Sequence, residues 1–120
     1  MFFSEKNKGA YLNNLRLRVS KKNSIEDCLF SSNREGVKFS NLNMRCSGCA
    51  ALDLAYVASG RLDGFFQNKI NIWDIAAGAL MIKEAGGIVN EIDKFNIKNI
   101  DIRASSSAIS DKMLEKLVNF

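Results

Sequence analysis

The spacing of apolar side chains changes along this sequence and separates an N-terminal strand region from a region that contains helices. Apolar and charged residues alternate at 15–19, Leu-Arg-Leu-Arg-Val, which is the pattern of a strand with one face in solvent. From residue 48 onwards, apolar positions recur at the spacing of one helix face, at Ala51, Leu54, Ala55 and Ala58. Gly60 is a favourable helix end, so we expect a helix over about 48–60.

The rest of the chain has the pattern of short strands, turns and two further helices. We expect strands and turns over 1–22, a loop over 33–44, and strands over 25–32, 62–67, 88–92 and 100–104. A largely buried helix is predicted over about 74–85, because two glycines at 86–87 can end it. A final helix would have Ser110 as its N-cap, Asp111 in its first turn, and an inward face made of Met113, Leu114, Leu117 and Val118. The strand–helix–strand order over 62–92 fits two parallel strands with a right-handed crossover, and predicts an α/β chain.

The composition narrows the class of protein. The chain has 120 residues, 47% hydrophobic and 25% charged, as in one ordinary globular domain. It contains neither an apolar run of the ~18 residues that a membrane helix needs nor a signal-peptide pattern, so we expect a cytoplasmic protein without a membrane partner. Histidine is absent, which excludes Ser-His-Asp and Cys-His nucleophiles and imidazole metal ligands.

The net charge of +4 comes largely from the first 22 residues, where six basic side chains face only Glu5. Such a basic strand face can contact nucleic acid or protein. It is more often a solvated surface, and the alternation of Arg16 and Arg18 with apolar residues supports that interpretation. We therefore do not expect nucleic acid to be the partner.

The chain contains three cysteines, Cys28, Cys46 and Cys49. An odd number of cysteines in a chain that is expected to be cytoplasmic argues against a disulfide framework. Cys46 and Cys49 form a CxxC at the start of the first predicted helix, but a closed zinc site would lack further ligands. A redox pair is one interpretation, because a helix N-terminus lowers the pKa of a thiol. We favour the other, that both are small buried residues.

Two helix starts carry the candidate chemistry. Asp74 lies on the first turn of the helix in NIWDIAAGALMIKEAGG, and small residues follow it at 76–78. A carboxylate there can be a cap or dipole partner, or it can hold a hard cation that bridges to a phosphate, with the small residues leaving space for the ligand. The helix start at Gly48, Cys49 and Ala50 is similarly small. The two starts indicate a shared anionic ligand, or else close packing of both helices.

These residues resemble the inositol monophosphatase family. The family signature Trp-Asp-x-Ala-Ala-Gly followed by Glu-Ala-Gly-Gly matches residues 73–78 and 84–87, and GCAALDLAYVASGRLDGFF and KGAYLNNLRLRVS are similar to preceding family segments. The resemblance implies a layered α/β sandwich with a mixed sheet and flanking helices. It makes Asp74 a Mg²⁺ ligand and places the substrate against the backbone of Gly48, Cys49 and Ala50. Gln67 matches a position where the family often has a glutamate that binds inositol hydroxyls.

Other features depart from the family pattern. The chain has no proline, so the family's Asp-Pro-Ile/Leu-Asp-Gly-Thr metal motif is absent, and the loop at 33–44 is shorter than usual, as though a helix were missing. CSGC falls where the family has a serine or threonine. Glu84 is too far along its helix to share the site, Asp53 is interpreted as structural, and Asp63 begins a strand after a turn. Within this chain, we assign no catalytic residue.

The resemblance therefore implies that residues 1–120 form the C-terminal half of a sugar or inositol phosphatase domain, without its N-terminal metal-binding half. We expect a phosphate monoester as the small-molecule ligand and little turnover by the chain alone. An N-terminal half in another chain, or a homodimer, would complete the site. The alternative is a non-catalytic module whose basic N-terminal strands contact protein or RNA.

Overall fold

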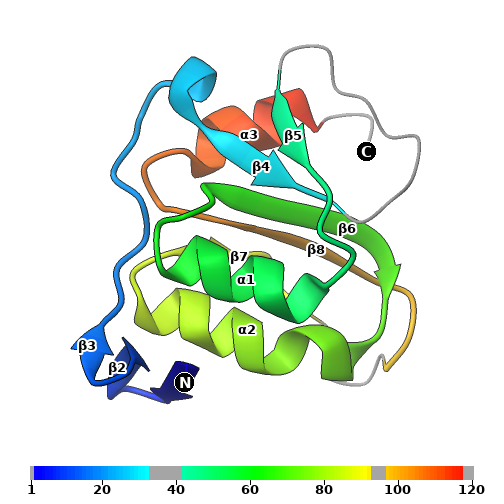
Figure 1. The fold of residues 1–120 in the computed structure, drawn as a ribbon. Coiled ribbons are helices and arrows are strands. Elements are labelled where there is room, and N and C mark those ends of the chain that lie inside the picture. Colours follow the sequence, from blue (N-terminus) through cyan, green and yellow to red (C-terminus); the bar gives the residue numbers. More distant parts are fainter. Residues whose placement is uncertain (1, 33–41, 93–96, 118–120) are drawn as a thin grey trace.

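The computed structural model describes residues 2–32, 42–92 and 97–117. A small three-stranded antiparallel sheet comes first, followed by a five-stranded mixed sheet with helices on both faces (Figure 1). The small sheet contains β1 (Phe2–Glu5), β2 (Gly9–Leu12) and β3 (Leu15–Arg16). The large sheet contains β4 (Leu29–Ser31), β5 (Asn43–Arg45), β6 (Gly64–Ile70), β7 (Ile88–Val89) and β8 (Ile100–Ser105). The helices are a 3₁₀ turn at Ile25–Asp27, α1 (Ala50–Ala58), α2 (Ile72–Glu84) and α3 (Ser110–Lys116).

The large sheet has the order β5-β4-β6-β8-β7. β4 is parallel to β5 and to β6, whereas β8 is antiparallel to both β6 and β7. The predicted strand–helix–strand unit therefore exists, and its two strands run in the same direction. The two strands do not pair directly, because β8 lies between β6 and β7. The sequence pattern of one unit could not show that a later strand is inserted into it.

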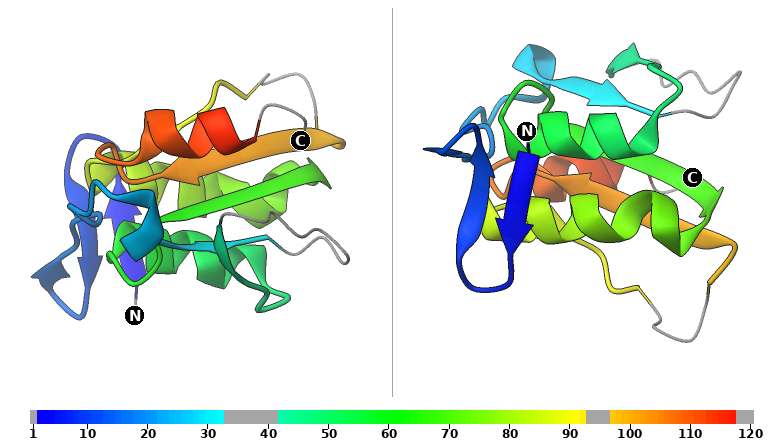
Figure 2. Two further views of the ribbon diagram at one scale, coloured as in Figure 1. Left: turned by 90° about the horizontal axis from the view of Figure 1, so that it is seen from above. Right: turned by 60° about the horizontal axis from the view of Figure 1, so that its bottom comes forward.

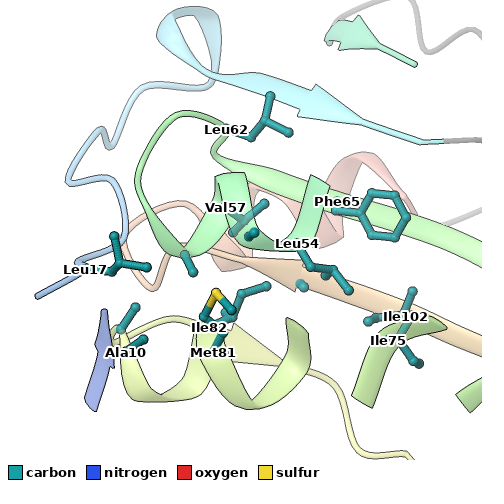
Figure 3. Packing of buried hydrophobic residues seen from close by; sticks show 14 of the residues in the cluster. Ala10, Leu17, Leu54, Val57, Leu62, Phe65, Ile75, Met81, Ile82 and Ile102 are labelled. Carbon is teal, nitrogen blue, oxygen red and sulfur yellow. The ribbon is translucent and has the colours of Figure 1, made fainter. Parts of the chain in front are cut away.

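Three layers are visible when the molecule is turned. α1 and α2 lie side by side on one face of the large sheet, and α3 lies on the other face (Figure 2). Adjacent residues of β6 face these two layers, because side chains alternate along a strand. Phe65 packs in the core cluster under α1 and α2 (Figure 3), and Phe66 packs in the second cluster with Met113 of α3. The predicted layered α/β sandwich is confirmed.

The small sheet is fastened to the end of α2 by a carboxylate. Glu84 accepts hydrogen bonds from the backbone N–H groups of Asn7 and Gly9, at 3.0 and 2.9 Å. These donors stabilise the charged form and hold the pKa of Glu84 below its usual value. The glutamate of the Glu-Ala-Gly-Gly segment thus binds the turn between β1 and β2, and it lies far from the start of its helix, as expected.

Several local predictions are corrected by the structure. Residues 25–32 form a 3₁₀ turn and a three-residue strand, β5 occupies 43–45 within a predicted loop, and 33–41 lie outside the described residues. α2 begins two residues earlier than expected, at Ile72, and β7 contains only two residues. Ile109, not Ser110, is the N-cap of α3. Three residues predicted to face inward are exposed: Ala51 in α1, Leu114 in α3 with 43% of its surface accessible, and Leu15 in β3 with 74% accessible. Val118, also predicted to face inward, lies outside the described residues.

Candidate functional site

The N-termini of α1 and α2 lie at the same end of the large sheet, where β6 ends (Figure 1). Between them is a cleft of about 380 Å³, lined by Gly48, Cys49, Ala50, Ala51, Gln67, Lys69, Ile70, Asn71 and Asp74. All five residues predicted from the sequence are in this set, although they come from three separate segments. The structure therefore brings the predicted site residues together in one place.

The start of α1 offers backbone N–H groups to this cleft. Cys49 is the N-cap residue, with extended backbone dihedrals, and no side chain caps the helix. The first N–H groups of a helix have no partner within it, and the helix dipole makes this end attractive to anions. Gly48 has a φ of +81°, which favours glycine, and a Cβ added there would have no heavy atom within 4 Å. The N–H group of Cys49 already donates to Ser47 Oγ at 3.0 Å, so the donors left for a ligand are those of the first turn of α1, which begins at Ala50.

The start of α2 presents one carboxylate. Asn71 is the N-cap, and Asp74 lies in the first turn with an exposed side chain. The side chain of Asp74 does not cap the helix, so the capping interpretation is wrong. Its position in the first turn is compatible with the other interpretation, a favourable interaction with the helix dipole. Among the residues that the structure describes, nothing hydrogen-bonds or ion-pairs with this carboxylate. It is available to a ligand in the cleft.

The small residues that follow Asp74 divide into two groups. Ala76 and Ala77 are exposed, whereas Gly78 is buried against α1. A Cβ at Gly78 would lie 2.5 Å from Leu54 Cβ and 2.7 Å from Leu54 Cδ1. For Gly78 the expectation of ligand space is therefore wrong, and the alternative of close helix packing is confirmed.

The sequence analysis missed four lining residues of the cleft, and Lys69 is the charged one among them. The pairing of β6 with β8 shifts register between Gln67 and Ile70, and Lys69 lies in this irregular stretch with a φ of +58°. Its N–H group donates to Asp101 Oδ1 of β8 at 3.3 Å. The backbone conformation depends on pairing with a distant strand, so no local pattern in the sequence indicates it.

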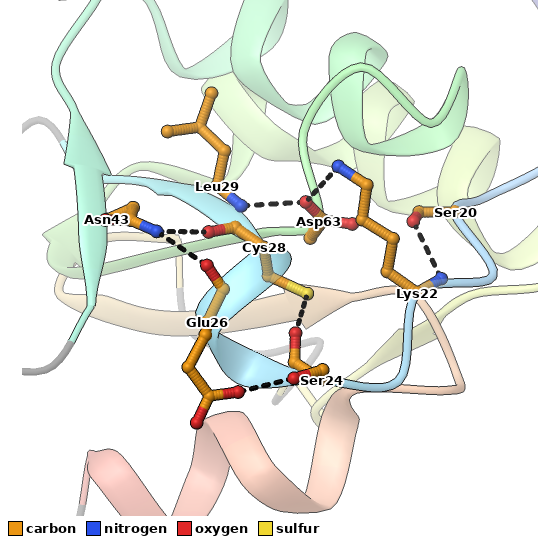
Figure 4. Close-up of polar contacts among 8 residues, drawn as sticks. All are labelled: Ser20, Lys22, Ser24, Glu26, Cys28, Leu29, Asn43 and Asp63. Carbon is orange, nitrogen blue, oxygen red and sulfur yellow. Dashed lines mark hydrogen bonds and ion pairs between the residues drawn. The ribbon is translucent and has the colours of Figure 1, made fainter.

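Two buried carboxylates outside the cleft are bound to structural partners. Asp53 accepts a hydrogen bond from Ser31 Oγ at 2.6 Å. Asp63 accepts the N–H of Leu29 at 2.8 Å and pairs with Lys22 at 3.7 Å (Figure 4). The structural interpretation of Asp53, made from the sequence, agrees with its contact, and Asp63 proves to be structural as well.

A Mg²⁺ ion needs about six oxygen ligands, usually one or two carboxylates together with phosphates and waters. Over residues 2–32, 42–92 and 97–117, no three or more His, Cys, Asp or Glu side chains are grouped so that they could hold a metal. The cleft itself supplies one carboxylate, that of Asp74. The described side chains therefore do not fit a complete Mg²⁺ site by themselves.

The cysteines differ from the favoured interpretation. Cys46 and Cys49 are exposed thiols, so the expectation that they are small buried residues is wrong. Cys28 is buried, and its thiol donates to the carbonyl of Ser24 at 3.3 Å (Figure 4). Burial, aided by the nearby Asp63, raises the pKa of Cys28 to about 11. Cys28 is thus a structural thiol, and Cys49 belongs to the cleft.

A second cavity, of about 450 Å³, lies beside the other face of α1 and contains none of the five predicted site residues. Its lining includes Arg45 and Arg61, and the Arg61 guanidinium lies 5.3 Å from the centre of the Tyr56 ring. The buried Asp53 also borders it, but Ser31 already occupies that carboxylate. The cleft at the helix N-termini is the better candidate because the carboxylate of Asp74 and the uncapped first turn of α1 meet there.

Comparisons with known proteins identify the family of this chain. The sequence model of the inositol monophosphatase family matches residues 1–119. A Nus factor SuhB of Haemophilus influenzae is 35% identical, and an inositol-1-monophosphatase of Caulobacter vibrioides is 34% identical, each over 98% of this chain. The extragenic suppressor protein suhB of Bartonella henselae superposes with a TM-score of 0.85 at 38% identity, over 98% of this chain and 53% of that chain.

The chain spans about half the length of the curated relatives it matches, namely 50% of the Haemophilus protein and 53% of the Caulobacter protein. The Haemophilus alignment extends over 134 residues, so that relative carries residues without a counterpart in this shorter chain. Within the described part of the chain, no helix is both long and apolar enough to cross a bilayer.

Proposed function

This chain belongs to the inositol monophosphatase family, and we propose that it forms the phosphate-binding part of a Mg²⁺-dependent phosphatase. The substrate would be inositol monophosphate or a related sugar phosphate monoester. The observation that carries this proposal is the cleft, where the first turn of α1, which no N-cap side chain caps, and the carboxylate of Asp74 line the same space. A helix N-terminus of this kind is suited to an anionic phosphate.

Each cleft residue has a proposed role. The backbone at Gly48, Cys49 and Ala50 binds the phosphate oxygens, and the amide of Gln67 hydrogen-bonds a hydroxyl of the alcohol part. Asp74 supplies one oxygen ligand to Mg²⁺. When bound, the metal would supply the activated water and charge neutralisation that phosphate ester hydrolysis requires.

We propose that the remaining metal ligands come from the part of the family's domain that this chain does not span. Residues 1–120 would then be the C-terminal half of that domain, completed by an N-terminal half or by a second copy of this chain. The exposed apolar side chains of Phe3 (52%), Leu52 (38%) and Trp73 (68%) are consistent with a surface that packs against another part. Alone, the chain should show little or no turnover, and its cytoplasmic location stays a prediction.

The test measures binding and phosphate release with the same purified chain. Inorganic phosphate and inositol 1-phosphate are titrated with Mg²⁺ present and absent, using the parent chain, Asp74→Asn and Asp111→Asn. Asp111 is a matched control because it is also exposed in the first turn of a helix, on the opposite face of the sheet. We expect phosphate binding whose Mg²⁺ enhancement disappears only in Asp74→Asn, without turnover.

Two results would contradict this proposal. Turnover by the parent chain that is lost in Asp74→Asn would show that the chain builds a working metal site, alone or by self-association. If inorganic phosphate does not bind to a chain with native circular dichroism, the cleft is not a phosphate site.

The second candidate function is a non-catalytic interaction module. It is favoured by the exposed positions of Arg16 and Arg18 and by relatives that are named Nus factor SuhB. Salt-dependent binding of RNA or of a protein, lost in the double variant Arg16→Glu, Arg18→Glu, would support it. If neither an RNA pool nor a pull-down at low salt gives binding that depends on these arginines, the candidate is excluded.

A further inference from the structure

The CxxC segment carries two exposed thiols, those of Cys46 and Cys49, whose side chains have no role in the proposed function. We infer that they form a redox-active dithiol, which an anionic small-molecule disulfide of the glutathione type oxidises to an intrachain disulfide. The inference does not depend on phosphate binding. It rests on the two thiols and on the second cavity, of about 450 Å³, which Cys46 lines.

The backbone between the two cysteines favours a bond between their side chains. The segment links β5 to α1 (Figure 1), and the chain bends at Gly48, whose φ is +81°. A positive φ at the third of four residues is typical of a type II turn, in which the first and last Cα atoms lie less than about 7 Å apart. A disulfide needs Cα atoms about 4.4–6.8 Å apart. The N–H group of Cys49 donates to Ser47 Oγ at 3.0 Å, which helps to hold this short segment in place.

The surroundings of the two thiols favour disulfide exchange over metal binding. A closed zinc site has four ligands. Over residues 2–32, 42–92 and 97–117, no three or more His, Cys, Asp or Glu side chains are grouped so that they could hold a metal. The third cysteine does not compete, because Cys28 is buried and its raised pKa keeps it in the unreactive thiol form. Cys46 and Cys49 are therefore the thiols that a small disulfide can reach.

The cavity beside Cys46 has the charge of a site for an anionic ligand. The guanidinium groups of Arg45 and Arg61 belong to residues that line it. The Arg61 guanidinium lies 5.3 Å from the centre of the Tyr56 ring, and this cation–π contact keeps it at the cavity wall. Among the described lining residues, Asp53 supplies the carboxylate, which is buried and already hydrogen-bonded. Oxidised glutathione carries several carboxylates, which arginine binds with paired hydrogen bonds.

The exchange balances with the small disulfide as its oxidant. The Cys46 thiolate, which lies at the cavity, attacks one sulfur of the small disulfide, the S–S bond breaks, and one small thiolate leaves. The Cys49 thiolate then attacks Cys46 Sγ and releases the second small thiolate, which leaves a Cys46–Cys49 disulfide. The two protons lost by the cysteine thiols pass through solvent to the released thiolates. The two electrons lost by the chain reduce the small disulfide.

The experiment follows this reaction by mass spectrometry at about pH 8 with the 120-residue chain. The probes are oxidised glutathione, which is anionic, and hydroxyethyl disulfide, which is neutral. The variants are Cys49→Ser, Cys46→Ser and the double variant Arg45→Gln, Arg61→Gln, with Arg16→Gln, Arg18→Gln as a control that removes the same charge from exposed arginines outside the cavity lining. Trypsin cleaves after Arg45 and Arg61, so peptide 46–61 contains both cysteines and separates them from Cys28.

We expect oxidised glutathione to convert peptide 46–61 of the parent to a form that lacks two hydrogen atoms and carries no adduct, and reduced glutathione to reverse this. Cys49→Ser should stop at a mixed disulfide on Cys46. The rate with oxidised glutathione, relative to hydroxyethyl disulfide, should fall about fivefold in Arg45→Gln, Arg61→Gln, as expected for exposed ion pairs, and stay unchanged in the control. About 0.5 M NaCl should remove this difference, because salt screens exposed charges.

Two results would overturn the inference. If the folded parent accumulates glutathione adducts on both cysteines in place of an intrachain disulfide, the two thiols do not act as a pair. If Arg45→Gln, Arg61→Gln keeps the parent's ratio of rates, the cavity does not select an anionic disulfide. Neither result bears on phosphate binding, so the proposed function is tested separately.

Discussion

Gly78 sets the distance between α1 and α2, and replacing it with alanine tests that contact directly. The added Cβ would lie 2.5 Å from Leu54 Cβ, far inside van der Waals contact. Leu54 Cβ is attached to the backbone of α1, so a side-chain rotation cannot relieve the overlap. The helices must move apart, or α2 must shift along α1.

Two opposing terms decide the stability of Gly78→Ala. Alanine improves helix propensity by about 1 kcal/mol, while overpacking a filled contact costs about 1–3 kcal/mol and more when backbones must move. Because the clash involves a Cβ and the fully buried Leu54, we take the upper end of that range. The free energy of unfolding should fall by about 2 kcal/mol, which lowers the urea midpoint by about 1 M.

The assay is urea unfolding followed by circular dichroism, with Ala77→Gly as the control. Ala77 is the neighbouring residue of the same helix and is exposed, so glycine there should cost only its propensity, about 1 kcal/mol. Gly78→Ala should therefore destabilise even though it improves propensity. It should also weaken phosphate binding, because both displaced helices border the cleft. A Gly78→Ala chain as stable as the parent would refute the close contact.

Three further predictions concern buried or paired groups. Glu84→Gln should loosen the turn between β1 and β2, which would be seen as faster amide exchange in that turn. The pKa of Glu84 is lower in the folded chain than in the unfolded chain. The variant should therefore be less stable than the parent above the unfolded pKa of about 4.3, and this difference should vanish as the pH falls through the folded pKa. At pH 8, a thiol reagent should modify the two exposed cysteines quickly and Cys28 only after unfolding, and equal reactivity of all three would contradict its burial. Ser31→Ala should lower the free energy of unfolding by about 1–3 kcal/mol, since it removes the donor to buried Asp53, and an unchanged urea midpoint would contradict this.

The helices could be predicted from the sequence because their signals are local. The apolar spacing of α1 and the glycines after α2 depend on residues within one or two turns, and both helices are found within two residues of their expected starts. The strand order could not be predicted in this way. The insertion of β8 between β6 and β7 depends on pairing across more than 30 residues, and alternation along one strand carries no information about its neighbours.

The candidate site, like the fold, could be predicted from the sequence only where its signals are local. Asp74 and Gly48 could be selected because helix starts have recognisable residue types, and the structure places both starts beside one cleft. Lys69 could not be selected, since its left-handed conformation results from the irregular pairing with β8. The exposure of Cys46 and Cys49 was also missed, because cysteine is among the most buried residue types and composition alone favours burial.

The carboxylates of this chain explain why the proposed Mg²⁺ site would need ligands from elsewhere. Asp53 is bound by Ser31, Asp63 by the backbone of Leu29, and Glu84 by the turn that fastens the small sheet. Withdrawing Asp53 or Asp63 toward the cleft would leave its donor without an acceptor, which costs about 1–3 kcal/mol each, and withdrawing Glu84 would release the turn between β1 and β2. Asp74 is therefore the carboxylate that this part of the chain can give to Mg²⁺ without loss of fold. Tight metal binding should appear only when a partner supplies further oxygen ligands, and Asp74→Asn should then abolish it while leaving the urea midpoint unchanged.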